Sequence, residues 1–199
     1  MDRPRPESAP DFAQLVSLAC HDLRTPLATV HGFARTLTRL EDVGETTARY
    51  LGLIEAASEQ LTELLDDLGL VARVEGGRWE PNLQETDLLE LTAAAAELVE
   101  EGVVDLSGPG GRVHVDRDAM RRAIYNLARC ALRHGMIDRV EVVVDGTELR
   151  LAPVGPDVAP IILGRDLRDL GAAVAVRVVE ALGGTAEVDG TALRVRLAG

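Results

Sequence analysis

The stretch CHDLRTPL, from Cys20 to Leu27, places a polar cluster and a proline inside a long apolar repeat. The apolar positions are spaced alternately four and three residues apart, and a period of about 3.5 predicts a helix with a coiled-coil-like seam. The seam consists of Phe12, Val16, Ala19, Leu23, Pro26, Val30, Phe33, Leu37 and Leu40. A proline within a helix removes one backbone donor and crowds the carbonyl four residues earlier, at a cost of about 3 kcal/mol. That carbonyl belongs to Asp22, so the distortion falls beside His21.

A second apolar repeat follows the turn EDVGE at residues 41–45 and ends at Gly76 and Gly77. Its seam consists of Tyr50, Ile54, Ala57, Leu61, Leu64, Leu68 and Val71. Two long helices joined by a short turn predict an antiparallel hairpin over residues 11–74. A lone hairpin has too few neighbours to bury the flanking leucines as well as both seams, so we expect two copies to form a dimeric four-helix bundle. The flanking leucines are Leu15, Leu27, Leu53 and Leu65.

The pattern changes at residues 75–78, and residues 78–199 predict an α+β layer with helices on one face of a mixed sheet. Strands are expected at 77–84, 112–116, 139–146, 148–154, 185–190 and 192–198, and helices at 87–101, 117–134 and 166–182. Asp87 and Asp116 precede two of these helices and are suitable N-caps. Residues 1–10 are rich in proline and charge, and we expect a disordered tail there.

Composition narrows the class of protein. The net charge of −12 argues against a nucleic-acid or anionic-membrane partner, and the sequence contains no lysine. Two cysteines, Cys20 and Cys130, do not form a disulfide framework and suit a reducing cytosol. No apolar run approaches the roughly 18 residues of a membrane span. We therefore expect a cytoplasmic protein that does not contact a membrane.

The heptad places His21 on the outside of the first helix. With Val16 at position a and Ala19 at position d, His21 falls at f, and Ser17 and Thr25 flank it one turn away. A histidine at such a position is most often an ordinary surface residue. The position alone therefore does not assign it a function.

The motifs together resemble the histidine kinase core family over nearly the whole chain after residue 10. HDLRTPL resembles the phosphoacceptor box of the family's dimerisation domain, and it lies in the first half of the first bundle helix. IYNLARCALRHG, residues 124–135, resembles the asparagine box of the ATP-binding domain. VRVVEALGGTAEVDG and ALRVRL resemble that domain's closing helix and final hairpin. The resemblance implies a degenerate histidine-kinase-type ATPase α/β sandwich after the bundle.

The resemblance also implies roles for four residues of the box. His21 is expected to take a phosphoryl group on a ring nitrogen, and Asp22 to orient the ring or accept its proton. Arg24 is expected to pair with phosphate oxygens. Thr25 matches the position that holds a water for dephosphorylation of a receiver domain.

The nucleotide motifs depart from the family. Asn126 fills the first position of the asparagine box, but the second, which should ligate Mg²⁺, is Cys130, and a thiol is a poor ligand for that hard cation. Of the box that should hold the adenine aspartate, PVGPD at 153–157 keeps only Gly155. We therefore expect these residues to be remnants, with no cofactor and no metal bound.

The segment that should form the phosphate-binding loop also departs from the family pattern. LRDLG at 167–171 keeps only Gly171 of the glycine-rich loop and places Asp169, an anion, where a triphosphate would lie. The segment from Gly155 to Gly171 is also too short for a mobile ATP lid, and Arg133 alone does not rebuild a phosphate site.

An intact phosphoacceptor box beside a decayed nucleotide site resembles the dimeric histidine phosphotransferases of bacterial phosphorelays. The resemblance implies transfer between receiver-domain aspartates through His21 without ATP, with Mg²⁺ supplied by the receiver. The expected partners are a second copy and response-regulator receiver domains, with a hybrid kinase as one source of such a domain. The alternatives are a compact ATP-dependent sensor kinase, a non-catalytic pseudokinase scaffold, or a receiver phosphatase that uses Thr25.

Overall fold

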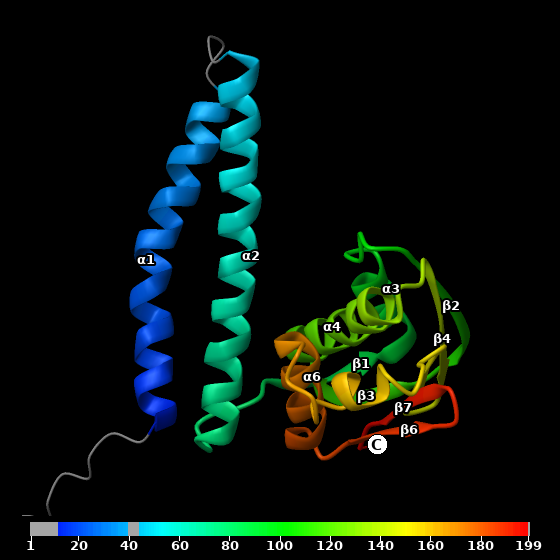
Figure 1. Cartoon of the computed structure of the whole chain (residues 1–199). Coiled ribbons are helices and arrows are strands. Elements are labelled where there is room, and N and C mark those ends of the chain that lie inside the picture. The colour runs from blue at the N-terminus through cyan, green and yellow to red at the C-terminus, as the bar shows by residue number, and fades with distance from the viewer. Residues whose placement is uncertain (1–11, 40–43, 199) are drawn as a thin grey trace, which may run out of the picture. The chain divides into compact units, whose positions relative to one another are not determined.

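The computed structural model describes residues 12–39 and 44–198 (Figure 1). The chain divides into two compact units, Met1–Trp79 and Glu80–Gly199. The division lies just after residues 75–78, where the sequence pattern changes. The tail expected at residues 1–10 lies outside the described residues. Within the described ranges, no helix combines the length and the apolar character needed to cross a membrane.

The first unit is an antiparallel helical hairpin of α1 (Phe12–Thr38) and α2 (Glu45–Glu75). Helix α1 continues through Pro26, although residue 26 has no backbone N–H to offer the Asp22 carbonyl. Helix α2 ends where the sequence predicts, because the N–H of Gly76 closes the last turn on the Ala72 carbonyl and Gly77 adopts a positive φ of 61°. The hairpin predicted from the two repeats is therefore the fold of this unit.

The contact between α1 and α2 does not use the predicted seams, and this part of the sequence analysis was wrong. The helices meet through residues that directly follow a seam residue. They are Cys20 and Ala34 on α1 and Leu51 and Ser58 on α2, and all four are buried. Leu27 and Leu65, which we expected a second copy to cover, occupy the same stripe and are half-buried, whereas Leu53 is exposed. The side chain of Leu15 lies outside those described.

Most large residues of the two seams are exposed on the isolated hairpin. They are Leu23, Val30, Phe33, Leu37, Tyr50, Ile54, Leu61, Leu64 and Leu68. Two helices touch along one narrow stripe, so a second stripe beside it finds no partner within one hairpin. The exposed surface that calls for a second copy is therefore the seam itself, together with the flanking Leu53.

The second unit contains a mixed five-stranded sheet in the order β2-β4-β5-β7-β6 and a separate pair, β1-β3. Strand β2 runs parallel to β4, and the other neighbours are antiparallel. The strands are β1 (Leu83–Asp87), β2 (Val103–Gly110), β3 (Arg112–Asp116), β4 (Arg139–Asp145), β5 (Glu148–Ala152), β6 (Thr185–Asp189) and β7 (Ala192–Arg196). The helices are α3 (Leu88–Ala96), α4 (Arg117–Gly135), α5 (Ala159–Ile162) and α6 (Leu170–Ala181).

The core lies between one face of the sheet and the helices (Figure 1). Strand β4 shows the expected alternation, since Val140, Val142 and Val144 are buried and the residues between them are exposed. Asp87 and Asp116 cap α3 and α4 as predicted, each accepting backbone N–H groups of the first turn. The α/β architecture expected for residues 78–199 is thus confirmed.

Strand β2 is absent from the predictions, the helix before it was predicted too long, and the strand before that helix was predicted too early. The glycines and proline of the β2 sequence, VVDLSGPG, are typical of a loop. The strand accommodates them with a bulge: its register shifts against β4 between Ser107 and Gly110, and Gly108 has a φ of 113°. A Cβ at Gly108 would lie 2.1 Å from the Val144 carbonyl oxygen, so only glycine fits this bulge. The helix expected to reach residue 101 ends at Ala96 because tight turns follow it, and the strand expected from residue 77 begins at Leu83.

Candidate functional site

His21 and Asp22 form an exposed pair on α1. The Nδ1 atom of His21 lies 3.2 Å from Oδ1 of Asp22, and the two side chains are 77% and 68% exposed. This exposure agrees with the f position expected from the heptad. A proton on Nδ1 facing the carboxylate leaves the lone pair on Nε2, which is the tautomer a nucleophile needs at that atom. The pair thus presents an accessible ring nitrogen to a partner.

Arg24 points to the other helix of the hairpin. Its Nη2 and Nε atoms lie 2.8 and 3.0 Å from Oδ1 of Asp66 on α2. The two side chains are a little more than one third exposed. Arg24 therefore joins the helices one turn from His21, in an ion pair that the sequence analysis did not foresee. Asp66 carried no local signal, because only the fold of the hairpin brings it opposite Arg24.

Thr25 lies one turn after His21 and is exposed. Its backbone carbonyl accepts a hydrogen bond from the Thr29 hydroxyl at 3.0 Å. The exposed surface around His21 thus contains Asp22 and Thr25, while Arg24 stands at its edge in the pair with Asp66. The four residues predicted from the box lie on a single helix within two turns.

In the second unit, the remnants of the asparagine box are buried beneath α6. Asn126 and Cys130 lie on α4 with relative exposures of 6% and 0%. Gly171, in the first turn of α6, lies so close that an added Cβ would come 2.8 Å from Cγ of Asn126. The amide of Asn126 therefore packs against the first turn of α6.

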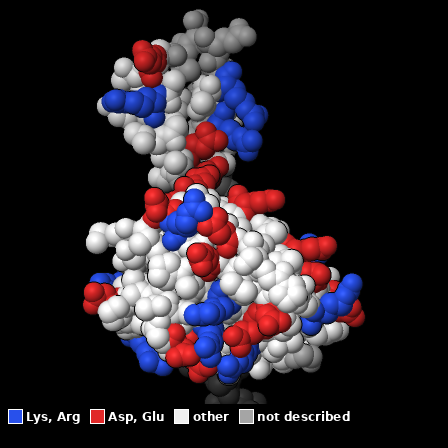
Figure 2. All heavy atoms as spheres, turned by 90° about the vertical axis from the view of Figure 1, so that its right-hand side faces the viewer, with Lys and Arg blue, Asp and Glu red and all other residues white. Residues whose placement is uncertain are grey.

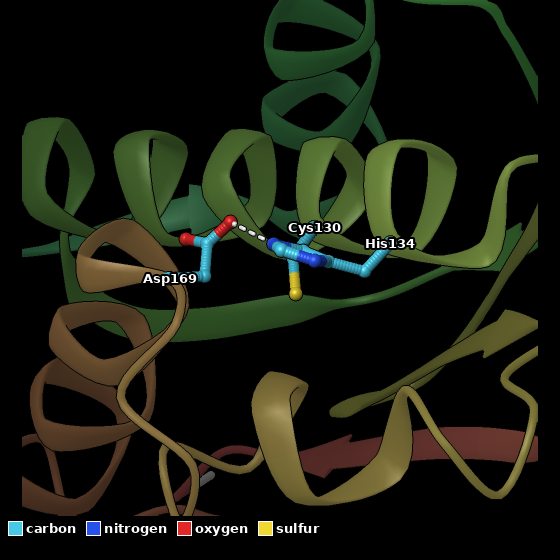
Figure 3. Close-up of side chains that lie close together, drawn as sticks. All are labelled: Cys130, His134 and Asp169. Atoms are coloured by element: carbon cyan, nitrogen blue, oxygen red, sulfur yellow. Dashed lines mark hydrogen bonds and ion pairs between the residues drawn. The ribbon is translucent and has the colours of Figure 1, made fainter.

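Cys130, His134 and Asp169 converge at the start of α6 (Figure 3). Nε2 of His134 lies 3.1 Å from Oδ2 of Asp169, and the other carboxylate oxygen, Oδ1, accepts the N–H of Ala172 at 2.9 Å as the N-cap of α6. Burial, and then the negative charge of Asp169, raise the pKa of the Cys130 thiol from 9.0 to about 12, while the charge of Arg133 acts in the opposite direction. The sequence analysis placed an anion here but missed His134 as its partner.

Gly155 stands apart from the other three remnants. Its carbonyl accepts the N–H groups of Val158 and Ala159 at 3.0 and 2.9 Å, and so begins the turn into α5. Ile161 and Ile162 of α5 are buried. A short apolar helix therefore follows the position where the family has its adenine contact.

Several charged side chains of the second unit form ion pairs with one another. Examples are Arg112 with Glu85, Arg139 with Asp105 and Arg196 with Glu148. Figure 2 shows arginine and acidic side chains interspersed on one face of the molecule, without a continuous basic field on that face.

Comparison with known proteins finds a family match within the first unit. Residues 13–77 match the family described as the His Kinase A (phospho-acceptor) domain. The sensor histidine kinase TrcS of Mycobacterium tuberculosis is 30% identical over 168 residues, which cover 75% of this chain and 33% of that protein. The chain spans about a third or less of the length of the curated relatives that it matches first.

Two solved structures share the fold across both units. Full-length ShkA in complex with AMPPNP has a TM-score of 0.68 and 23% identity, covering 94% of this chain and 47% of that one. A structure described as a bacterial phosphotransferase has a TM-score of 0.50 and 13% identity, covering 97% of this chain and 100% of that one. At these identities the likeness concerns the fold.

Proposed function

Because the chain belongs to the histidine kinase core family, we propose that it is a histidine phosphotransferase of a two-component phosphorelay. It would pass a phosphoryl group between receiver-domain aspartates through His21 without using ATP. The observation that carries the proposal is the packing of α6 onto α4, which covers Asn126 and Cys130 at the position a nucleotide would need. His21, in the other unit, remains open to a protein partner.

The proposed transfer step uses Nε2 of His21 as the nucleophile. Nε2 attacks the phosphorus of a receiver's aspartyl phosphate, an N–P bond forms, and the P–O bond to the aspartate breaks. The aspartate leaves as a carboxylate, and the charge that develops on the ring is stabilised by Asp22, which faces Nδ1 at 3.2 Å. The reverse step loads a second receiver. Mg²⁺, which a phosphoryl transfer of this kind needs, would come with the receiver.

The residues at the nucleotide position do not fit Mg²⁺-ATP. Cys130 offers a buried neutral thiol where an oxygen ligand is required, and Asp169 places a carboxylate where phosphates would approach. Asp169 is also held by His134 and by the N–H of Ala172, so it is not available to turn away. The proposed transfer therefore does not use ATP.

The shared fold does not decide between kinase and phosphotransferase. One neighbour was solved with AMPPNP, and another is described as a phosphotransferase. The decision rests on the residues at the α4–α6 contact rather than on the architecture.

The proposed partners follow from the site. A second copy of the chain would cover the exposed seam of the hairpin, and receiver domains, including that of a hybrid kinase, would bind at His21. The cytoplasmic location and the lack of nucleic-acid and membrane partners stay predictions from the sequence.

Thr25 supports a second candidate function, dephosphorylation of a receiver. It is exposed one turn from His21, where its hydroxyl has room to position a water against a bound aspartyl phosphate. Under this function the Thr25→Ala protein loses phosphatase activity, while transfer to His21 is spared.

The proposal is tested by two labelling reactions on the full chain. In the first, the protein is incubated with ATP labelled at the γ-phosphate. In the second, it is incubated with receiver domains from the same genome that have been loaded with labelled phosphate from acetyl phosphate. We expect acid-labile, base-stable label only in the second reaction, and none when His21 is replaced by alanine.

The other outcomes are equally informative. Label from ATP, together with ATP binding in calorimetry, would overturn the proposal in favour of a compact kinase. No label from any receiver would favour a phosphatase or a non-catalytic scaffold.

A further inference from the structure

We propose that Cys130, His134 and Asp169 bind a Zn²⁺ ion in the second unit. The thiol, a ring nitrogen and a carboxylate oxygen all lie within 4.8 Å of one another. Figure 3 shows Cys130 and His134 approaching from α4 and Asp169 from the start of α6. This inference replaces the expectation from the sequence that the protein holds no metal, and it does not depend on His21 or on the phosphoryl transfer.

The donor set suits zinc and excludes magnesium. Thiolate sulfur, imidazole nitrogen and carboxylate oxygen are the three ligand types of protein zinc sites, whereas Mg²⁺ requires oxygen. Zn–N and Zn–O bonds of about 2.1 Å in a tetrahedron separate two ligand atoms by about 3.4 Å, and a Zn–S bond widens this to about 3.6 Å. Nε2 of His134 and Oδ2 of Asp169 are already 3.1 Å apart. The thiol lies within 4.8 Å of both atoms, so closure on an ion requires the sulfur to approach them.

The three ligands are held by the fold. Cys130 and His134 are four residues apart on α4 and therefore share one face of the helix. Asp169 is fixed through its second oxygen, Oδ1, which accepts the N–H of Ala172 at 2.9 Å. A hydrogen-bonded second oxygen of this kind orients a carboxylate for a metal. The site is thus pre-organised by the same N-cap that begins α6.

The surroundings leave room for exchange with solvent. Cys130 is fully buried, but the side chains of His134 and Asp169 are 21% and 12% exposed, so an ion has a path in and a water can supply the fourth ligand. On binding, the thiol proton passes to solvent and the thiolate becomes the ligand. Bound Zn²⁺ would join the start of α6 to α4.

A second group of metal-binding side chains must be separated from this one in any test. His31, Glu55 and Glu59 in the hairpin also lie within 4.8 Å of one another. That group contains no sulfur, and Arg35 lies 4.0 Å from Glu55, where it competes with a cation. A signal from a metal–thiolate bond therefore distinguishes the two groups.

The test uses the full chain, freed of metal with a chelator and titrated with Co²⁺ and then with Zn²⁺. We expect a thiolate-to-cobalt charge-transfer band that saturates at one equivalent and is displaced by Zn²⁺. Cys130→Ala should abolish the band, and Asp169→Asn, which keeps an N-cap, should weaken Zn²⁺ binding at least about 100-fold. Cys20→Ala, which removes the other buried cysteine, and His31→Ala should both leave the band unchanged.

Three results would overturn the proposal. They are the absence of the band in the wild-type protein, its persistence in Cys130→Ala, and unchanged Zn²⁺ affinity in Asp169→Asn. Circular dichroism of each metal-free variant shows that it is folded. The Zn²⁺-dependent rise in the midpoint of thermal unfolding, present in the wild type and lost in Asp169→Asn, gives a second readout.

Discussion

The side chain of His21 makes little packing contact with the rest of the hairpin. Its side chain is 77% exposed, and its one described hydrogen bond goes to its neighbour Asp22. A substitution there changes the chemistry offered to a partner while leaving the hairpin contact untouched. The phosphoryl-transfer proposal can therefore be tested at this residue without disturbing the fold.

We expect His21→Ala to abolish labelling by a phosphorylated receiver and to change the free energy of unfolding by less than about 0.5 kcal/mol. The measurement is retention of label after gel electrophoresis, with urea unfolding followed by circular dichroism. His31→Ala is the matched control, because it removes a second histidine from α1 and should still take label. Label on the His21→Ala protein would contradict the prediction and show that His21 is not the phosphoacceptor.

Asp22→Asn should slow transfer by about 10²- to 10⁴-fold without abolishing it. The amide can still accept a hydrogen bond from Nδ1, but it cannot accept the proton or balance the charge that develops on the ring. The measurement is the single-turnover rate of label transfer from a receiver. An unchanged rate would show that the contact of 3.2 Å has no part in transfer.

Cys130 should make the metal-free protein less stable at alkaline pH. Below 9.0, the ordinary pKa of the thiol, both the folded and the unfolded chain hold the proton, and between 9.0 and about 12 only the folded chain holds it. Stability therefore falls with rising pH in this window, by at most about 1.4 kcal/mol per pH unit. Urea unfolding on either side of 9.0 should show a shallower pH dependence in Cys130→Ala, and equal slopes would contradict the prediction.

At the scale of elements, aspartates begin three helices of the second unit. Asp87, Asp116 and Asp169 accept first-turn N–H groups of α3, α4 and α6. Asp169 differs in that its other oxygen bonds a side chain of another helix, His134. Asp169 therefore both caps the start of α6 and links it to α4.

Asp169→Ala should lower the free energy of unfolding of the metal-free protein by about 2 kcal/mol, from the lost cap and the lost bond to His134. Asp169→Asn should cost less, because asparagine is a good N-cap. Urea unfolding followed by circular dichroism measures both. Equal losses in the two variants would assign the whole effect to the charge and none to the cap.

At the scale of the whole molecule, the hairpin leaves its seam uncovered. Leu23, Phe33 and Leu61 are 54%, 66% and 50% exposed, alongside the other large seam residues of α1 and α2. A continuous apolar stripe of this kind on a soluble surface indicates an interaction site. Pairing with a second copy would bury it and complete a four-helix bundle.

Val30→Glu should convert a dimer into monomers, as should Leu61→Glu. Each residue is about half exposed on the single hairpin, so the carboxylate stays solvated in the monomer but is buried without a partner in the dimer. Light scattering should give twice the mass of one chain for the wild type and the mass of one chain for the variants. Ala28→Glu, at an exposed f position, is the control and should remain dimeric, and a monomeric wild type would refute the prediction.

Local patterns determined much of this protein. The heptad spacing indicated two helices and the outward position of His21, the alternation in RVEVVVD indicated a strand with one buried face, and Asp87 and Asp116 marked helix starts. Each of these signals depends on residues only a few positions apart, because helix faces, strand faces and caps are set by neighbours along the chain. The departures at Cys130 and Asp169 were likewise visible in the sequence.

The tertiary structure decided which of these residues meet. Three features depend on contacts between distant segments of the chain: the buried stripe between α1 and α2, the ion pair of Arg24 with Asp66, and the bulge at Gly108 against Val144. Asp169 meets His134 across 35 residues of sequence. The spacing of side chains along one helix or strand fixes a face, but only the packing of elements fixes what that face touches, and the α4–α6 cluster exists only because two helices pack at that point.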